Sequence, residues 1–362
     1  MKKDEMINSF GLSTMICALC CSSFYGVFSS YILHESLNSS IISILIGFIL
    51  SLIISKLILK LFNTNTNLSY SKKIKKIYGK FSIIIIILSI LCSLFGYILL
   101  TYRLTTFLSN QYLVETPKYI ILLLIILTTY YISSKGIETT IRVSTICFYI
   151  STIIFLFDFF SLVNQINFQN YLPIINVSIK KIIITAFIFS LYFSITTTQI
   201  YAIKKDQISD KEKFNKYFYI MITISFIIIF LSTSTIIGVS GISIINLYDY
   251  PVYSTLKRIK LFSFLDSIEN ISIMSWIFYI INASSMFLLF IFNTLKNTFN
   301  LNNTKSNVFN IIIVLIAFSI PNFIFLKNNY NESYEYIYLP LIIELIVLLI
   351  VIFSLIKNRL KN

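Results

Sequence analysis

Residues 82–108 read SIIIIILSILCSLFGYILLTYRLTTFL, and Arg103 is the only charged side chain among them. A helix that crosses a lipid bilayer needs about 20 consecutive, mainly apolar residues, so this stretch is long enough to span a membrane and to tilt within it. A helix that is apolar on every face must be buried either in protein or in lipid. The stretch therefore predicts a transmembrane helix.

Apolar stretches of this kind recur along the whole chain of 362 residues. Hydrophobic residues make up 57% of the sequence and charged residues only 12%, whereas a soluble globular chain carries about 25% charged residues. The mean hydropathy is +0.84. We therefore expect an all-α integral membrane protein with about ten transmembrane helices. The predicted spans are approximately residues 9–32, 40–60, 82–108, 118–133, 142–163, 182–203, 217–237, 270–293, 308–327 and 337–356.

The basic residues alternate in density between successive loops. If the N-terminus lies inside, 21 of the 29 Lys and Arg residues fall on the inner side. Cytoplasmic loops of membrane proteins carry such an excess, so the pattern predicts an even number of spans and two cytoplasmic termini. The formal net charge of +14 thus belongs to short loops, and no stretch is long enough to form a basic nucleic-acid-binding domain.

The sequence offers little for catalysis or metal binding. It has a single histidine, His34, and no phosphate-binding loop, dinucleotide fingerprint or HExxH metal motif. The five cysteines all lie within apolar stretches: Cys17, Cys20, Cys21, Cys92 and Cys147. We therefore expect buried thiols, no disulfide framework, no metal site, no cofactor and no enzymatic activity.

The longest predicted outer loop, Gly238–Glu269, is half apolar and half polar or charged. This composition predicts a partly ordered amphipathic hairpin or helix at the membrane surface. The chain contains no Pro-, Gly- or Ser-rich linker, so residues 1–362 are expected to form one polytopic membrane domain.

Ten spans can be divided into five plus five, with repeat one at about 9–163 and repeat two at about 182–356. Transporters built from inverted repeats interrupt equivalent helices, and irregular backbone within a bilayer survives only where protein buries it or where it lines a cavity. The first and sixth spans are therefore the helices to compare. They carry unusually polar stretches, CCSSFYGVFSS at 20–30 and FSLYFSITTTQIY at 189–201.

These polar stretches supply the candidate ligand-binding residues: Ser22, Ser23, Gly26, Ser194, Thr196 and Thr197. Backbone amides freed near Gly26 would bind a carboxylate at the N-terminus of a half-helix. The alternative is that the hydroxyl groups only allow close helix packing and bond to carbonyls of their own helix.

Two carboxylates, Asp158 and Glu344, also lie inside predicted spans. A charge at the bilayer centre costs roughly 3 kcal/mol on insertion scales, so both are candidates for coupling or gating. Alternatively they reach the membrane surface or pair with Arg103 or Lys327. Arg103 itself, near the outer end of the third span, is predicted to be an anchor at the membrane surface.

Four segments together resemble the B subunit of bacterial spore germinant receptors, a family within the amino acid–polyamine–organocation transporter superfamily. They are LVETPKYI at 113–120, KGIETTIRVSTI at 135–146, NYLPII at 170–175 and YPVYSTLKRIKLFSFLDSIENISIMSWIF at 250–278. The residues that match the family pattern are Thr116, Pro117, Gly136, Glu138, Arg142, Pro173, Tyr250, Pro251, Arg258, Phe264, Leu265 and Trp276.

The matched residues are those of a scaffold rather than of a ligand site. Glu138 and Arg142 are four residues apart, which allows an ion pair on one helix face. Pro117 suits the first turn of a helix, while Pro173 and Pro251 fix loop geometry.

The sequence departs from the family after the Phe-Leu pair. The family often has Glu-Arg and then an acidic residue, whereas this chain has Asp266, Ser267 and Glu269. The missing arginine removes an ion pair from the outer loop that faces a partner subunit.

The resemblance implies a fold of the leucine-transporter type and a role as a membrane subunit of a nutrient germinant receptor in the spore inner membrane. Such a subunit acts with an A subunit and a lipoprotein C subunit. It would bind a small germinant, such as an amino acid, between the first, third, sixth and eighth helices. The alternative is a proton- or ion-coupled secondary amino acid transporter that uses Asp158 or Glu344. A lipid-linked polysaccharide flippase or polymerase is a third class, but these usually have more spans or a long catalytic outer loop.

Overall fold

The computed structural model describes residues 6–245, 247–259, 269–325 and 335–359, and its regular secondary structure there is helical apart from one isolated bridge between Ile7 and Ile208. The long helices are α1 (Ser9–Ser23), α2 (Ser29–Ser36), α3 (Ser40–Asn63), α5 (Ser82–Gln111), α6 (Lys118–Ser134), α7 (Ile137–Val163), α8 (Ile179–Thr197), α9 (Lys211–Ser240), α12 (Glu269–Phe299), α13 (Asn303–Ile320) and α14 (Glu335–Arg359). The π-helical turn η1 (Phe24–Phe28) joins α1 to α2, the 3-10 turn η5 (Thr198–Ala202) extends α8, and the π-helical turn η7 (Pro321–Phe325) extends α13. The connections contain three short α-helices, α4 (Tyr70–Tyr78), α10 (Ile242–Ile245) and α11 (Pro251–Leu256). They also contain 3-10 turns at Leu37–Ser39, Gly79–Phe81, Phe168–Tyr171 and Lys205–Gln207.

The described residues contain ten passes of the length and composition that a membrane needs. Eight stretches are long and apolar enough to cross a bilayer, and α6 is a shorter apolar helix. One of the eight, Ser9–Asn63, turns back at Leu37, which has a φ of 50°, and therefore supplies two passes. The bounds agree with the ten predicted spans to within a few residues at most ends. The largest differences are six residues: α9 begins at Lys211 rather than near 217, and α12 ends at Phe299 rather than near 293.

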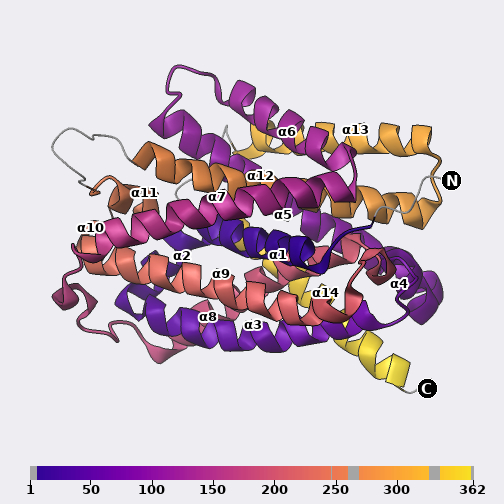
Figure 1. Cartoon of the computed structure of the whole chain (residues 1–362), viewed down its shortest axis with the longest axis horizontal. Helices are drawn as coiled ribbons and strands as arrows, with labels where there is room; N and C mark the ends of the chain where they lie inside the picture. Colours follow the sequence, from indigo (N-terminus) through magenta and orange to yellow (C-terminus); the bar gives the residue numbers. More distant parts are fainter. Residues whose placement is uncertain (1–5, 246, 260–268, 326–334, 360–362) are drawn as a thin grey trace.

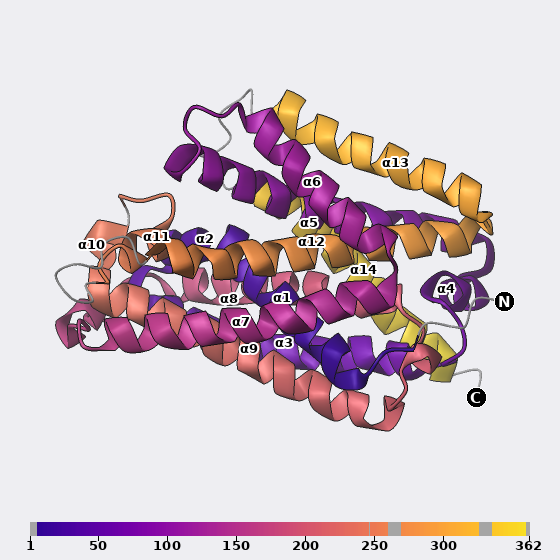
Figure 2. The same cartoon turned by 45° about the horizontal axis from the view of Figure 1, so that its top comes forward.

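The passes run side by side along one axis (Figures 1 and 2). One end of the bundle carries the start of α1, the finish of α14 and α4, and we call it the terminal end. The opposite end carries α10, α11 and the connection between α7 and α8, and we call it the α11 end. Both views place α6 beside α13 at one edge of the bundle, away from α3 and α9.

Helix α1 lies in the centre of the bundle, and 14 of its 15 side chains are buried. Small residues such as Gly11, Ala18 and Cys20 allow close approach, because lipid-embedded helices associate by packing rather than by a hydrophobic driving force. At Gly11, an added Cβ would lie 2.8 Å from Ile141 Cγ2 of α7. Helix α1 accordingly packs against α7, α8, α9 and α12.

The outer surface of the bundle is apolar. Large side chains such as Ile53 of α3, Leu124 of α6 and Phe160 of α7 are between 57% and 65% exposed. A soluble monomer rarely exposes contiguous apolar patches on this scale. The surface therefore fits a bilayer, as the composition predicts.

The predicted surface segment near Gly238–Glu269 contains two short helices joined by turns where it is described. It contains α10 and α11, and most side chains of α11 are buried, so this helix covers the α11 end of the bundle. Pro251 stands at the first turn of α11, the position where a missing N–H costs nothing. The family-matched residues Phe264 and Leu265, and the departures Asp266 and Ser267, lie outside the described residues.

At the terminal end, the loop before α9 in the second predicted repeat contacts the start of α1 in the first. Asp210 accepts hydrogen bonds from the backbone N–H of Ser9 at 2.7 Å and from its hydroxyl at 2.6 Å. Partial burial alone raises the pKa of Asp210, but these hydrogen bonds outweigh it and hold the pKa below its usual value. The carboxylate therefore anchors the start of α1 to the loop before α9.

The ion pair that the spacing of Glu138 and Arg142 allows is present in the first turns of α7, where Arg142 is largely exposed and Glu138 partly exposed. An exposed pair of this spacing stabilises a helix by only about 0.3–0.5 kcal/mol. Its role is thus local, at the start of α7.

Candidate functional site

The first pass changes its helical geometry at its middle. The N–H of Ser29 bonds to the carbonyl of Phe24, five residues back, so the chain makes a wider π-helical turn between α1 and α2. Such turns inside α-helices occur frequently at functional sites. The backbone stays helical throughout, so the half-helix N-terminus expected near Gly26 is not open in this structure.

Gly26 lies within this turn, and α5 and α12 approach it so closely that there is little room for a side chain. A Cβ at this position would lie 3.1 Å from Leu100 Cδ2 and 3.5 Å from Ile280 Cδ1. A larger side chain would have to displace both residues. Close packing by α5 and α12 thus gives a reason for glycine at this position in addition to the backbone geometry predicted from the sequence.

Arg103 of α5 reaches the same turn. Its side chain is only 5% exposed, and its Nε donates a hydrogen bond to the carbonyl of Gly26 at 3.2 Å. The guanidinium also lies 5.4 Å from the ring centroid of Tyr250. The prediction of an anchor at the membrane surface is therefore wrong. Binding a carbonyl of the turn and an aromatic face offsets the cost of burying this charge.

The two serines before the turn partly fit the alternative interpretation, in which hydroxyl groups bond to carbonyls of their own helix. The hydroxyls of Ser22 and Ser23 both donate to the carbonyl of Leu19 in their own helix, at 2.8 and 3.0 Å. Ser23 also lines two small cavities beside the turn, whereas Ser22 lines neither of them.

The first cavity lies between α1, η1 and α8 and has a volume of about 10 Å³. Thr196 lies on its α8 side, with Oγ1 3.4 Å from Cys20 Sγ. Tyr192 and Phe28 supply aromatic walls. The structure thus brings Ser23 and Thr196, one candidate from each polar stretch, to one cavity.

The second cavity lies between η1, α5, α8, α12 and α14 and has a volume of about 10 Å³. Ser23 and Tyr192 line it too, together with Gly96 and Leu100 of α5. The two cavities therefore flank Ser23 and Tyr192, and we refer to them together as the central site. Tyr192 and the α5 residues were missed by the sequence reasoning, which considered only hydroxyls and glycines of the first and sixth spans.

The other two candidates of the sixth span lie away from these cavities. Thr197 Oγ1 donates to the carbonyl of Ser194 at 3.1 Å, within its own helix. Ser194 Oγ lies 2.6 Å from Glu344 Oε1 of α14. Ser194 is thus a partner of the buried carboxylate and not part of the cavity lining.

Glu344 is 1% exposed and joins three helices. Besides the contact with Ser194 of α8, its Oε2 lies 3.3 Å from Cys92 Sγ of α5. It neither reaches the membrane surface nor pairs with Arg103. Lys327, the other partner considered, lies outside the described residues.

Asp158 of α7 is 9% exposed, and its Oδ1 accepts a hydrogen bond from the hydroxyl of Ser272 in α12 at 2.5 Å. It lines a separate cavity with Tyr25 and Trp276, which is nearer the α11 end. The structure therefore places Asp158 and Glu344 at different sites. A role in coupling or gating has to be argued for each carboxyl group separately.

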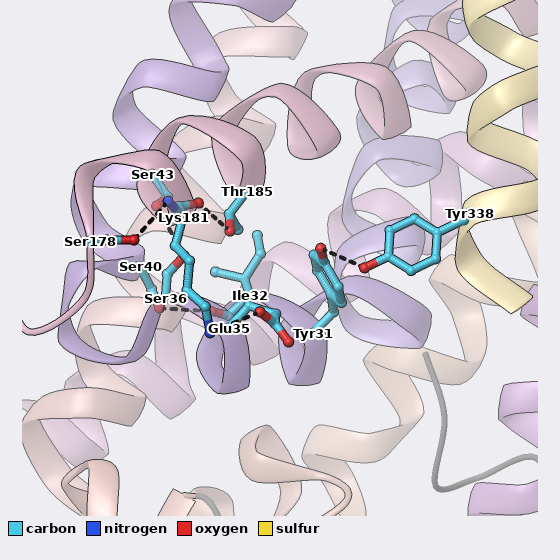
Figure 3. A network of polar contacts seen from close by, with 10 residues as sticks. All are labelled: Tyr31, Ile32, Glu35, Ser36, Ser40, Ser43, Ser178, Lys181, Thr185 and Tyr338. Carbon is cyan, nitrogen blue, oxygen red and sulfur yellow. Dashed lines mark hydrogen bonds and ion pairs between the residues drawn. The ribbon is translucent and has the colours of Figure 1, made fainter. Parts of the chain in front are cut away.

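Polar contacts at the α11 end hold α2 against its neighbours (Figure 3). Lys181 Nζ, at the start of α8, lies 3.4 Å from Glu35 Oε2 near the end of α2. The hydroxyls of Tyr31 in α2 and Tyr338 in α14 lie 3.4 Å apart. The half of the first pass beyond η1 is thus connected to α8 and α14.

Metal ligation has little support in the parts of the chain that the structure describes. There, no group of three or more His, Cys, Asp or Glu side chains lies close enough together to hold an ion. The cysteines described as free include Cys17, Cys20 and Cys21 of α1, which are fully buried.

Comparison with known proteins gives two further findings. A family model described as spore germination protein matches residues 7–324. No curated protein matches the sequence. Among solved structures, the manganese transporter of Eremococcus coleocola in complex with an aromatic bis-isothiourea substituted compound has a TM-score of 0.64 at 11% identity, covering 96% of this chain and 78% of the transporter.

Structures of two variants of that transporter have TM-scores of 0.61 and 0.62 at 13% identity, with the same coverage. At such low identity the likeness concerns the fold alone. It confirms the predicted all-α membrane architecture of the leucine-transporter type. The exact limits of the two repeats remain a prediction.

Proposed function

Because the chain belongs to the spore germination protein family, we propose that it is the membrane subunit of a nutrient germinant receptor. In this proposal it binds a small germinant, such as an amino acid, at the central site. Its activity is then binding and signalling rather than catalysis. The observation that carries the proposal is the π-helical turn η1, which borders two cavities at the centre of a transporter-type fold.

The central site has features that suit a small amphipathic ligand. Its walls are mostly apolar or aromatic, and Ser23 and Thr196 add hydroxyl groups. Arg103 brings a buried positive charge to the carbonyl of Gly26, at the same turn. A carboxylate-bearing ligand would be attracted to this charge if the turn opened and released its amides.

Ligand binding would act by shifting a conformational equilibrium. A ligand can do this only if its affinity differs between the two states. The turn η1 is a suitable switch, since its conversion would move α2 relative to α1 and change the cavity lining. Glu344 is suited to gating because Ser194 and Cys92, on two other helices, contact its carboxylate.

The proposal includes partners and a location. The chain would act in the spore inner membrane with an A subunit and a lipoprotein C subunit, with both termini in the cytoplasm. The family membership and the basic loops at the terminal end support this arrangement.

Replacing Gly26 by leucine tests the site. The new side chain would displace Leu100 and Ile280 and occupy the space beside the turn. We expect spores with Gly26→Leu to lose their nutrient response while the protein stays at normal abundance in the membrane. The matched control is Thr128→Leu on α6, where the side chain is exposed. A normal response of Gly26→Leu spores at normal nutrient concentrations would refute the site.

The second candidate function is a proton- or ion-coupled secondary transporter for amino acids. The fold similarity to a transporter and the buried carboxylates Asp158 and Glu344 favour it. Uptake of amino acids into proteoliposomes that depends on a proton gradient would support transport. Binding without uptake would support the receptor.

A further inference from the structure

A cavity separate from the central site lies near the α11 end, between α7, α9 and α12, with α11 along one side. Its volume is about 40 Å³, compared with about 10 Å³ for each central cavity, and it opens partly to the surface. None of its lining residues is shared with the two central cavities. The rest of its lining is largely aromatic and aliphatic, and its polar residues are Asp158, Ser232, Thr235, Thr255 and Ser275.

Asp158 is the one carboxyl group among the described residues that line this cavity. The described lining residues include no lysine, arginine or histidine, and the ion pairs found in the described chain do not involve Asp158. Among the described residues, the hydroxyl of Ser272 donates a hydrogen bond to it. Because burial disfavours an ionised carboxylate without a counter-charge, a cation bound beside Asp158 would stabilise the ionised form.

The aromatic walls of the cavity favour an organic cation over a metal ion. Tyr25 stacks on Trp276 with ring centroids 5.7 Å apart, and on Tyr279 with centroids 6.2 Å apart. Aromatic rings attract organic cations through their electron-rich faces. A bare divalent metal ion prefers six or more oxygen ligands, and this lining contains a single carboxylate.

We propose that this cavity binds a small organic ammonium cation. The ammonium group contacts Asp158, and the carbon atoms of the ligand lie against Tyr25, Trp276 and Phe159. This second site goes beyond the proposed germinant site. The two sites adjoin the same turn, because Tyr25 belongs to η1 and its hydroxyl lies 2.6 Å from Ser232 Oγ of α9.

The chain carries its own reporter for this site. Trp276 is its only tryptophan, and it lines the cavity. The purified full chain in lipid nanodiscs can be titrated with phenethylammonium, while tryptophan emission is excited selectively over tyrosine. Phenethyl alcohol is the neutral probe of nearly the same shape, and sodium chloride controls for ionic strength. We expect a saturable change with the ammonium and at least tenfold weaker binding of the alcohol.

Two variants separate charge from shape. Asp158→Asn keeps the side-chain volume and is expected to weaken phenethylammonium binding at least tenfold. Asp206→Asn is the matched control, because Asp206 is partly exposed, pairs with Lys211 and does not line this cavity, and it is expected to leave binding unchanged. Thermal unfolding of each variant shows whether it is folded.

If Asp158→Asn does not fold, Thr235→Leu serves instead, since the larger side chain occupies cavity space without touching the charge. It too should weaken binding at least tenfold. No saturable response of the wild-type chain, equal affinity for ammonium and alcohol, or wild-type affinity in the folded cavity variants would each overturn the proposal. Because the readout is local to this cavity, it is independent of any germinant response at the central site.

Discussion

Glu344 and Arg103 are ionisable side chains buried within the bundle, and each has identified contacts there. The carboxylate lies against Ser194 and Cys92, and the guanidinium bonds to the carbonyl of Gly26 and lies near Tyr250. Each interaction joins helices that are distant in sequence. These two side chains are therefore the residues at which small substitutions test the account most sharply.

Truncation of Glu344 is expected to destabilise the bundle. Alanine leaves a void and removes the acceptor beside Ser194 and Cys92, which should cost about 1–3 kcal/mol. Glutamine retains an acceptor oxygen and nearly the same volume, so it should cost much less. The measurement is the melting temperature of Glu344→Ala and Glu344→Gln in the same nanodiscs. Equal melting temperatures for wild type and alanine variant would show that these contacts contribute nothing to stability.

Substitution of Arg103 is expected to impair the nutrient response. Arg103→Gln removes the charge beside Gly26, so the nutrient concentration that gives half-maximal germination should rise at least tenfold. Arg142→Gln is the matched control, because Arg142 is exposed and its pair with Glu138 is worth little. If the two variants needed the same nutrient concentration for half-maximal germination, Arg103 would not be part of the proposed site.

Sequence reasoning identified some site residues and missed others for physical reasons. Ser23 and Thr196 stood out because hydroxyls are scarce in apolar spans, and both line the first central cavity. Tyr192 resembled the many other aromatic residues, so nothing in one sequence distinguished it. The position of Arg103 near the end of its span predicts an anchor at the membrane surface. Its real partner, a carbonyl of the first pass, could be known only from the packing of α5 on η1.

At the scale of elements, the turn η1 divides the first pass into two helices with different neighbours. Helix α1 packs against α7, α8, α9 and α12, while α2 contacts α8 and α14 through Glu35 and Tyr31. A π-helical turn contains one residue more than an α-helical turn. Its removal should therefore be possible without rotating either flanking helix.

Deletion of Val27 is expected to convert η1 into a regular α-helical turn. Because α1 and α2 would keep their facing, contacts such as Glu35 with Lys181 should persist and the melting temperature should change little. The nutrient response should be lost, since the turn can no longer switch. Deletion of Met15 in α1 is the control, which should rotate the rest of the pass and unfold the protein. A stable Val27 deletion with a normal response would exclude η1 as the switch.

The elements themselves were largely predictable. A bilayer requires every span to be a long apolar helix, so the ten passes follow from hydropathy alone. The sequence did not predict α4, because its nine residues are rich in lysine and lie in a loop. Nor did it predict that η1 would stay helical, since serines and glycine are compatible with both a break and a bulge.

At the scale of the whole molecule, the distribution of basic residues predicts a definite orientation in the membrane. The terminal end should face the cytoplasm and the α11 end the opposite side. The start of α1 and the finish of α14 lie at one end of the bundle, as an even number of passes requires (Figure 1).

Cysteine labelling tests this orientation. A cysteine introduced at Asn65, between α3 and α4, should react with a membrane-impermeant maleimide only from the cytoplasmic side. A cysteine at Gln169, between α7 and α8, should react only from the other side. Both positions are exposed, whereas the native cysteines are buried or half-buried. Labelling of both positions from one side would contradict the predicted topology.

The central claim is that the chain is a receptor subunit that senses a nutrient. The most direct test is to delete its gene in the organism that encodes it and to measure germination of purified spores on defined nutrients. Growth and amino acid uptake of vegetative cells are measured in parallel. The account predicts loss of the response to one class of nutrient, with growth and uptake unchanged. Normal germination combined with defective uptake would contradict it and would identify the chain as a transporter.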